Sequence, residues 1–147
     1  MRKLIFIFMT LVLTACSLGG QTEIERNKEK WQAANISHYR YNLFVGCFCV
    51  FSQDMPLIVE VKDGELVSMK YQSGNEIDTS SRELFEKYAS IERVFSELET
   101  NINGKADKVT VTYDPMYGFP AKIDVDFIKN AMDDELSLTV SNFEKLP

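Results

Sequence analysis

Two cysteines one residue apart, Cys47 and Cys49, are the side chains of this sequence best suited to chemistry. They lie in an alternating apolar run, and an extended strand would place both sulfurs on one face with Cα atoms about 6.6 Å apart. That spacing is near the upper limit of about 6.8 Å for a disulfide, and Gly46 allows a local bend that closes the gap. Three interpretations stay open: a Cys47–Cys49 disulfide, two buried unlinked thiols, and a soft-metal or thiol-exchange site.

Few other side chains are placed to assist a thiol. His38 is the only histidine, and it precedes the predicted strand, where a surface position is the default. Only His38 and Arg40 lie close enough in sequence to lower a thiol pKa. A structural zinc site requires four ligands, whereas the chain offers two thiols and one histidine. We therefore expect no metal site, and soft-metal binding by the two thiols stays an alternative.

Five carboxylates surround one predicted hairpin: Asp124, Asp126, Asp133, Asp134 and Glu135. They lack the spacing of a calcium loop, so a solvated polar face is favoured over a calcium-dependent surface. The sequence also contains no hydrolase motif and no glycine-rich phosphate loop. We expect neither enzymatic activity nor a cofactor.

The first fifteen residues have the pattern of an export signal. A positive start at residues 2–3 is followed by an apolar run over residues 4–13, which is too short to span a bilayer. The next stretch, Leu13-Thr14-Ala15-Cys16, resembles the lipobox of bacterial lipoproteins, in which the cysteine carries the lipid. We expect a lipoprotein signal peptide over residues 1–15, lipidation of Cys16 and a flexible tether over residues 16–21. The alternative is an ordinary cleaved signal with an incidental cysteine.

Charge and the residue after Cys16 set the expected location and partners. A serine directly after the cysteine, here Ser17, resembles the pattern of lipoproteins that are sent to the outer membrane. In a two-membrane source we therefore expect the protein at the outer membrane, facing the periplasm. Otherwise we expect the outer face of the cell membrane. Without residues 1–15 the chain keeps 14 basic and 22 acidic residues, a net charge of −8, which repels nucleic acid. The expected partner is the membrane, through the lipid, with another envelope protein as a second candidate.

The first half of the remaining chain predicts one helix and three strands. Thr22 and Glu25 fit a capping box at the start of a helix that carries Trp31. Alternation from Tyr39 to Phe51 predicts one long strand, and Phe44, Phe48 and Val50 lead us to expect its far half to be covered on both faces. Strands at 57–61 and 66–71 flank Asp63-Gly64, and a three-residue loop would set Val59 opposite Val67.

The second half repeats that order. Apolar residues from Leu84 to Ile102 recur at steps of four and three, which predicts one amphipathic helix for core packing or, less simply, for a partner groove. Strands follow at 109–113, 123–127 and 136–140. Residues 22–147 thus predict a single α+β domain of order α-βββ-α-βββ. We expect an antiparallel β-sheet of about six strands with two helices packed on one face.

The turn between two of these strands, Tyr113 to Pro120, is unusually aromatic. Asp114 and Pro115 suit its bend, but Tyr117 and Phe119 are not explained by turn chemistry. Asp114, Tyr117 and Phe119 are therefore candidate partner-binding residues, with Tyr117 expected to point outward. The alternative is that one or both rings fold back over the sheet edge and seal the core.

Much of the chain resembles a family of uncharacterised bacterial lipoproteins, domain of unknown function 6174. The resemblance rests on Trp31, Tyr39-Arg40-Tyr41, Cys47-Phe48-Cys49, Val61-Lys62-Asp63-Gly64, the segment from Tyr113 to Pro120, and Asp133-Asp134-Glu135. It implies an envelope lipoprotein and no established activity. Our leading hypothesis is a membrane-anchored, non-catalytic binding or assembly module. The alternative is a thiol-redox or soft-metal-binding envelope protein that uses Cys47 and Cys49.

Overall fold

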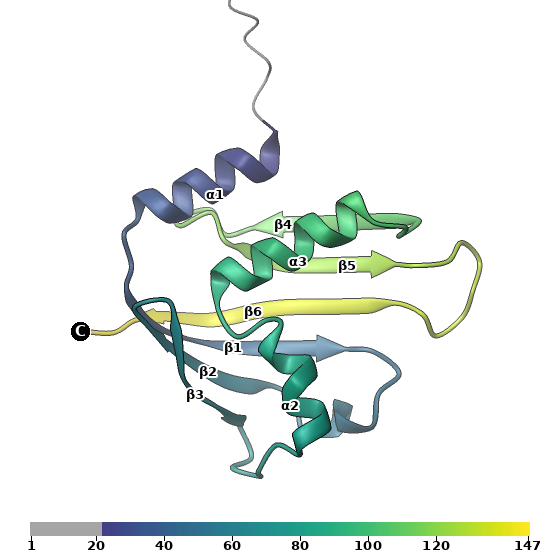
Figure 1. The fold of residues 1–147 in the computed structure, drawn as a ribbon, viewed down its shortest axis with the longest axis horizontal. Coiled ribbons are helices and arrows are strands. Elements are labelled where there is room, and N and C mark those ends of the chain that lie inside the picture. Colours follow the sequence, from purple (N-terminus) through teal and green to yellow (C-terminus); the bar gives the residue numbers. More distant parts are fainter. Residues whose placement is uncertain (1–21) are drawn as a thin grey trace, which may run out of the picture.

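A six-stranded antiparallel sheet organises the computed structural model, which describes residues 22–147 (Figure 1). In chain order the elements are α1 (Glu23–Ala33), β1 (His38–Gly46), the 3-10 helix η1 (Val50–Gln53), β2 (Leu57–Lys62), β3 (Glu65–Tyr71), α2 (Thr79–Glu86), α3 (Ile91–Asn103), β4 (Lys108–Tyr113), β5 (Pro120–Asp126) and β6 (Leu136–Lys145). The predicted α+β class and antiparallel sheet are confirmed. The predicted signal peptide, Cys16 and tether lie outside the described residues.

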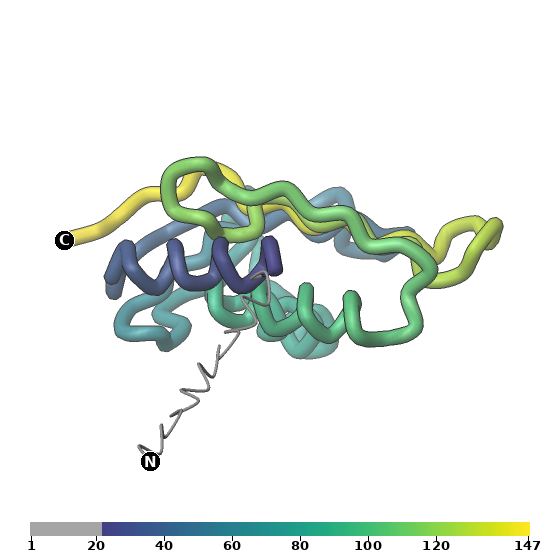
Figure 2. The backbone as a smooth tube through the Cα atoms, turned by 90° about the horizontal axis from the view of Figure 1, so that it is seen from above, coloured from purple at the N-terminus to yellow at the C-terminus, as the bar shows by residue number. Residues whose placement is uncertain are grey.

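The strand order across the sheet is β3-β2-β1-β6-β5-β4. The first and last strands are therefore neighbours at its centre, where Val45 pairs with Leu138 and Gly46 with Ser137. All the described helices lie on one side of the sheet, as the view along its edge shows (Figure 2). This one-sided packing agrees with the prediction.

The core fills the space between the sheet and the helices. Alternate residues of β1 are fully buried on the helix side, namely Tyr39, Tyr41, Leu43 and Val45. Helix α3 faces them with a stripe of buried side chains, Ile91, Val94, Phe95 and Leu98. Burial of this apolar surface is the main driving force for folding. The amphipathic pattern of this segment therefore reflects core packing, the simpler of its two interpretations.

The predicted single helix over residues 84–102 is wrong, because the chain forms two helices there and the described residues contain three α-helices. Helix α2 begins at its N-cap Asp78, and α3 begins after Ser90, whose hydroxyl accepts from the Arg93 N–H at 3.3 Å. The free Ile91 N–H donates to the Tyr39 hydroxyl at 3.1 Å. This contact from β1 satisfies an amide that a continuous helix would have paired internally.

The predicted long strand through Phe51 is also wrong, since β1 ends at Gly46. The Cys49 N–H turns back to donate to the Cys47 carbonyl at 2.8 Å, and η1 follows. Phe48 and Val50 are consequently exposed instead of covered on both faces.

The register of the β2–β3 hairpin differs from the one that we predicted. Asp63 and Gly64 both have positive φ, and they form a two-residue turn with Lys62 opposite Glu65. A bulge then makes Val67 the extra residue, so Val59 faces Met69 instead of Val67. The bulge restores buried positions on the helix side, since Met69 is buried and Val67 is exposed.

Candidate functional site

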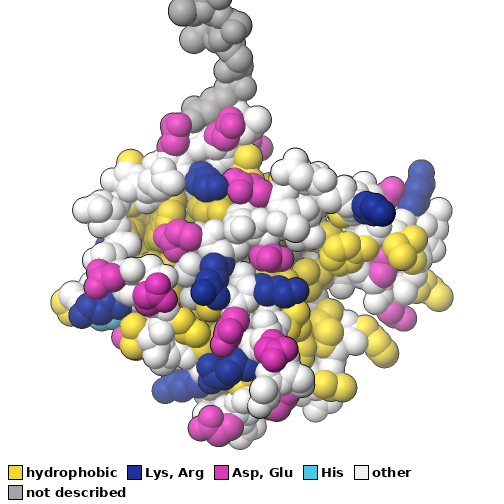
Figure 3. Space-filling view, viewed as in Figure 1, with side chains coloured by type: hydrophobic (Ala, Val, Ile, Leu, Met, Phe, Trp, Pro, Cys, Tyr) yellow, Lys and Arg dark blue, Asp and Glu magenta, His cyan; other side chains and the backbone are white. Residues whose placement is uncertain are grey.

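Exposed apolar side chains gather at one end of the sheet, which we call the apolar loop end. It comprises Phe48 and Val50 after β1, Ile102 at the end of α3, and Phe127, Ile128 and Met132 between β5 and β6. The pairings of Gly46 with Ser137 and of Leu136 with Val125 bring these connections to the same end. In Figure 3 hydrophobic side chains are visible together on the corresponding right-hand side.

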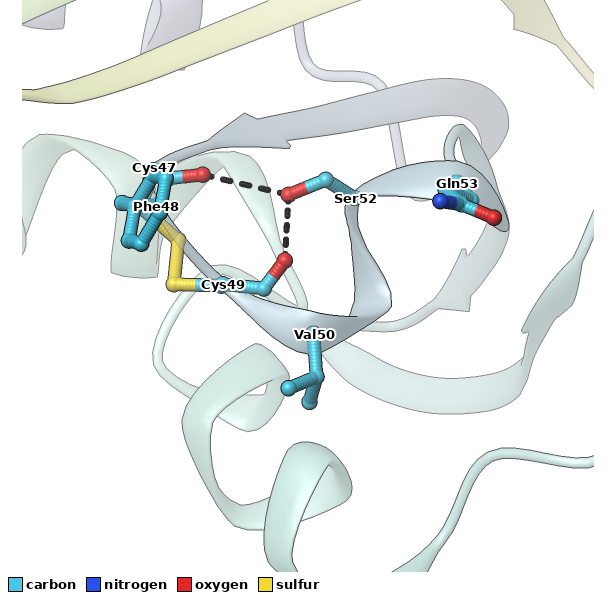
Figure 4. A pocket seen from close by; sticks show the side chains of 6 residues that line it. All are labelled: Cys47, Phe48, Cys49, Val50, Ser52 and Gln53. Carbon is cyan, nitrogen blue, oxygen red and sulfur yellow. Dashed lines mark hydrogen bonds between the residues drawn. A yellow bond between two sulfur atoms is a disulfide. The ribbon is translucent and has the colours of Figure 1, made fainter.

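Phe48 and Val50 stand on a cross-linked turn. A disulfide joins Cys47 and Cys49 in the structure, and their Cα atoms lie 5.2 Å apart instead of the about 6.6 Å of an extended strand. The Ser52 hydroxyl lies within 3.1 Å of the Cys47 carbonyl oxygen and 2.7 Å of the Cys49 carbonyl oxygen (Figure 4). These short-range bonds hold the turn while Phe48 is 88% exposed and Val50 is 98% exposed.

A shallow, open hollow of about 460 Å³ lies beside this turn. It is lined by Cys47, Phe48, Cys49, Val50, Ser52 and Gln53 (Figure 4). Both cysteines are half-buried against the core, and no lysine, arginine or histidine lines the hollow. The arrangement offers apolar contact surface, with no lining cation to stabilise a thiolate.

His38 and Arg40 do not assist the cysteines. Both lie at the opposite end of β1, and at about 3.3 Å per residue His38 is about 25 Å from Gly46. The Arg40 guanidinium donates to Glu144 Oε2 at 2.7 Å. His38 contacts the Pro147 carbonyl oxygen through Nδ1 at 2.7 Å and Glu60 Oε1 through Nε2 at 3.1 Å. These two hydrogen bonds, the one to Pro147 most of all, raise the pKa of His38 above its ordinary value.

The connection between β5 and β6 contributes the other part of the apolar loop end. Ile128 is 62% exposed and Met132 is 87% exposed. The Ile128 N–H donates to Asp134 Oδ2 at 2.6 Å, which closes the loop across its base. Asn130 and Asp133 have positive φ, as residues in tight bends often do.

Two of the five carboxylates near this hairpin, Asp124 and Asp134, are bonded to protein groups. The Lys122 ammonium lies 2.8 Å from Asp124 Oδ2, and this hydrogen bond holds the pKa of that carboxyl below its ordinary value. Asp124 Oδ1 accepts from the Ser137 hydroxyl at 2.8 Å. Within residues 22–147 no group of three or more His, Cys, Asp or Glu side chains is arranged to hold a metal ion. The calcium alternative therefore has no geometric support.

The aromatic turn lies at the other end of the sheet, where its candidate residues serve its own structure. Asp114 Oδ1 accepts from the Met116 N–H at 2.9 Å and the Tyr117 N–H at 2.6 Å. Phe119 is only 3% exposed and packs against Trp31 and Phe143, so its ring belongs to the core instead of a contact surface.

Tyr117 does not project freely from that turn. It is half-buried, with its ring centroid 5.5 Å from that of Phe143 and the Lys145 ammonium 4.8 Å above it. The side chain of the turn that does project is Met116, which is 68% exposed. The structure thus brings Asp114, Tyr117 and Phe119 into one turn but leaves no outward aromatic pair. A binding role for Tyr117 stays a prediction.

The aromatic turn instead fastens α1 to the sheet. The Lys30 ammonium donates to the Pro115 carbonyl oxygen, and Trp31 packs edge-on against Phe119. The same tryptophan also reaches α3, since Trp31 Nε1 donates to Glu92 Oε1 at 2.7 Å. Helix α1 is therefore held by β5 through the turn and by α3 through Glu92.

Sequence reasoning identified the cysteine pair but missed most of the apolar loop end. Alternation places Val50 in a covered strand, and no motif marks Ile128 or Met132. One available signal was an isoleucine and a methionine in a segment of otherwise polar composition, because connections run over the surface.

The fold and these loops define an α+β sheet domain with a cysteine-bridged turn and an apolar end. The chain belongs to the family of unknown function DUF6174, whose sequence model matches residues 23–145. The predicted resemblance to a domain of unknown function is thereby confirmed. No curated protein matches the chain, and no solved structure matches it either. Over residues 22–147, no helix has the length and apolar character needed to cross a membrane.

Proposed function

We propose that this protein is a lipid-anchored component of the bacterial cell envelope that acts as a non-catalytic binding or assembly module. The observation that carries the binding role is the apolar loop end. Phe48, Val50 and Met132 are each at least 87% exposed, although their loops stand on a well-packed sheet. Exposed apolar groups gathered at one place mark interaction sites, and short closed loops lose little entropy when a partner covers them.

The anchor rests on the sequence pattern that ends at Cys16. Helix α1 begins directly after Thr22, whose hydroxyl accepts from the Glu25 N–H while Glu25 returns a bond to the Thr22 N–H. A capped start six residues after Cys16 leaves a short link between the lipid and the domain. The proposed location is the outer membrane, facing the periplasm, in a two-membrane source, and otherwise the outer face of the cell membrane.

The alternative function is thiol–disulfide exchange at Cys47 and Cys49. One observation favours it: both cysteines line an open hollow, although they are half-buried against the core. In such a reaction a partner thiolate attacks one sulfur, and the other leaves as a thiolate. A second partner thiol then resolves the mixed disulfide, so that the partner is oxidised and Cys47 and Cys49 are reduced. Soft-metal binding would use the same reduced pair.

The contact surface can be tested with a photo-crosslinking amino acid placed singly at Phe48, Met132 or Met116 of the full-length protein in its own envelope. Met116 is the matched control, because it is also an exposed apolar side chain but lies at the opposite end of the sheet. We expect crosslinks at positions 48 and 132 to exceed those at 116 by several-fold. Equal yields at all three positions would contradict a contact role for the apolar loop end.

The anchor and the alternative have separate tests. Cys16→Ala should abolish labelling by a radioactive fatty acid, and unchanged labelling would refute lipidation at that residue. For the alternative, the folded protein is treated with a mild thiol reductant and then alkylated. Rapid reduction of Cys47 and Cys49 without unfolding would favour exchange chemistry, whereas resistance would favour a structural bridge.

A further inference from the structure

Most of the exposed apolar side chains lie at the apolar loop end, and Phe44, which is 41% exposed, lies close to it on β1. Val67 and Met116 are exposed at the opposite end of the sheet and stand alone there. By contrast, three separate connections supply the apolar loop end: the turn after β1, the end of α3 and the loop between β5 and β6. Strand spacing places the roots of the first and third about 10 Å apart, with β6 between them. The side chains can therefore enter one surface together.

The shape of the apolar loop end favours a lipid bilayer over a protein as its partner. Phe48 and Val50 on the turn after β1 and Met132 on the loop between β5 and β6 project almost fully into solvent. Protein interfaces need matched shape around well-packed anchor residues. A bilayer interface instead accepts projecting aromatic and aliphatic side chains at the boundary between headgroups and acyl chains.

The short link to the lipid limits how far the start of α1 can lie from a membrane. Cys16 and Thr22 are six residues apart, so the chain between them spans at most about 20 Å. Figure 1 shows α1 starting on the β4 side of the sheet and running away from the apolar loop end. The link therefore leaves the domain from the end of α1 that is nearer to the apolar loop end, whereas Asn27 and Lys30 further along α1 contact the aromatic turn. With the start of α1 held within about 20 Å of the bilayer that carries the lipid, that bilayer is the membrane surface nearest to the loop tips.

Charge selects the kind of lipid. The exposed charged residues of the loop that carries Met132 are Lys129, Asp133 and Glu135, and the chain without residues 1–15 has a net charge of −8. Anionic headgroups are repelled by such a surface, whereas zwitterionic headgroups are not. We propose that the apolar loop end inserts into the zwitterionic interface of the bilayer that holds the lipid. This inference rests on the proposed lipid anchor, and it names the partner of the same contact surface.

Brominated lipid can test the insertion. The full-length lipidated protein is reconstituted in phosphatidylcholine vesicles with and without dibromo-phosphatidylcholine, which quenches nearby tryptophan. Phe48→Trp and Met132→Trp report on the apolar loop end, and Met116→Trp is the control. The buried Trp31 is common to all variants and supplies the baseline. We expect the tryptophans at 48 and 132 to lose about half of their added emission, as interfacial side chains lie about 5–10 Å deep. The tryptophan at 116 should lose none.

Flotation of the same vesicles separates the two proposals. Protein that floats while positions 48 and 132 stay unquenched would overturn the insertion and leave the lipid anchor intact, and a protein partner would then be the occupant. Protein that fails to float would overturn both. Equal quenching at 48, 132 and 116 would also overturn the insertion, because it would mean adsorption without a preferred end. Replacing half of the lipid with phosphatidylglycerol should reduce quenching at 48 and 132, and increased quenching would contradict the charge argument.

Discussion

Gly118 approaches Asn27 so closely that a methyl group on its Cα would lie 2.6 Å from the Asn27 carbonyl oxygen. Gly118 also has φ of +80°, which side chains rarely adopt. The contact joins the aromatic turn to α1, and the Lys30 ammonium reinforces it at the Pro115 carbonyl oxygen. Position 118 therefore needs glycine for two independent reasons.

Gly118→Ala should destabilise the domain more than a positive φ alone explains. Gly74→Ala is the matched control, since Gly74 has φ of +87° but nothing within 4 Å of an added Cβ. We expect Gly74→Ala to cost about 1–2 kcal/mol and Gly118→Ala to cost about 1–3 kcal/mol more. Urea unfolding of both variants measures the difference. Equal losses would mean that the turn moves away from α1 without penalty.

The bridge between Cys47 and Cys49 closes a very short loop, so its removal should cost little. Chain entropy for a three-residue loop corresponds to about 1–2 kcal/mol, and we expect that loss for the Cys47→Ser, Cys49→Ser double variant. Alkylation in denaturant without reductant should leave both cysteines unmodified by intact mass. Addition of reductant is the control and should allow two alkyl groups. Two groups added without reductant would favour unlinked thiols.

Tyr117 and Phe119 should differ sharply although they share one turn. Phe119 is in the core, so Phe119→Ala should cost about 3–5 kcal/mol. Tyr117 is half-buried against Phe143, and Tyr117→Ala should cost about 1–2 kcal/mol. Denaturant unfolding tests both values. Loss of crosslinked partners from Tyr117→Ala at unchanged stability would instead support the contact role that the sequence suggested.

Stability should fall as His38 loses its proton. Folding raises the pKa of His38 above 6.5, so the fold favours the charged ring. This contribution is fully present below the unfolded pKa and is lost as pH rises through the folded pKa. Wild-type protein should therefore lose stability between about pH 6 and pH 8 that His38→Gln does not lose. As His38 is the only histidine, NMR titration can check its pKa directly, and a value at or below 6.5 would contradict the argument.

Local patterns in the sequence predicted several elements well. The Thr22 and Glu25 capping box is present, and alternation located β4, β5 and β6 because one face of each strand packs on the core. The same rule failed at Cys47. Residues 47, 49 and 51 keep the parity of β1, but the bridge and the Cys49-to-Cys47 hydrogen bond bend the chain. The alternation of apolar residues gives no sign that the chain bends into a bridged turn here.

Contacts between distant residues explain the other failures. The break before α3 depends on the Tyr39 hydroxyl from β1, a partner 52 residues away from Ile91. The candidate site could be predicted only in part, for a similar reason. The cysteines are visible in the sequence, whereas the grouping of Phe48 with Met132 depends on the pairing of β1 with β6, which no local pattern encodes.

The central pairing of β1 with β6 also fixes the order in which the protein can be completed. Residues 136–145 must be available before the middle of the sheet closes, so a nascent chain that ends before Leu136 cannot finish it. Until then one edge of β1 keeps unpaired amides and carbonyls, which invite pairing with other chains. This delay suits the export that we propose, because a chain threads a secretion channel before it folds. The domain reaches its final fold only after its last strand has been synthesised and released.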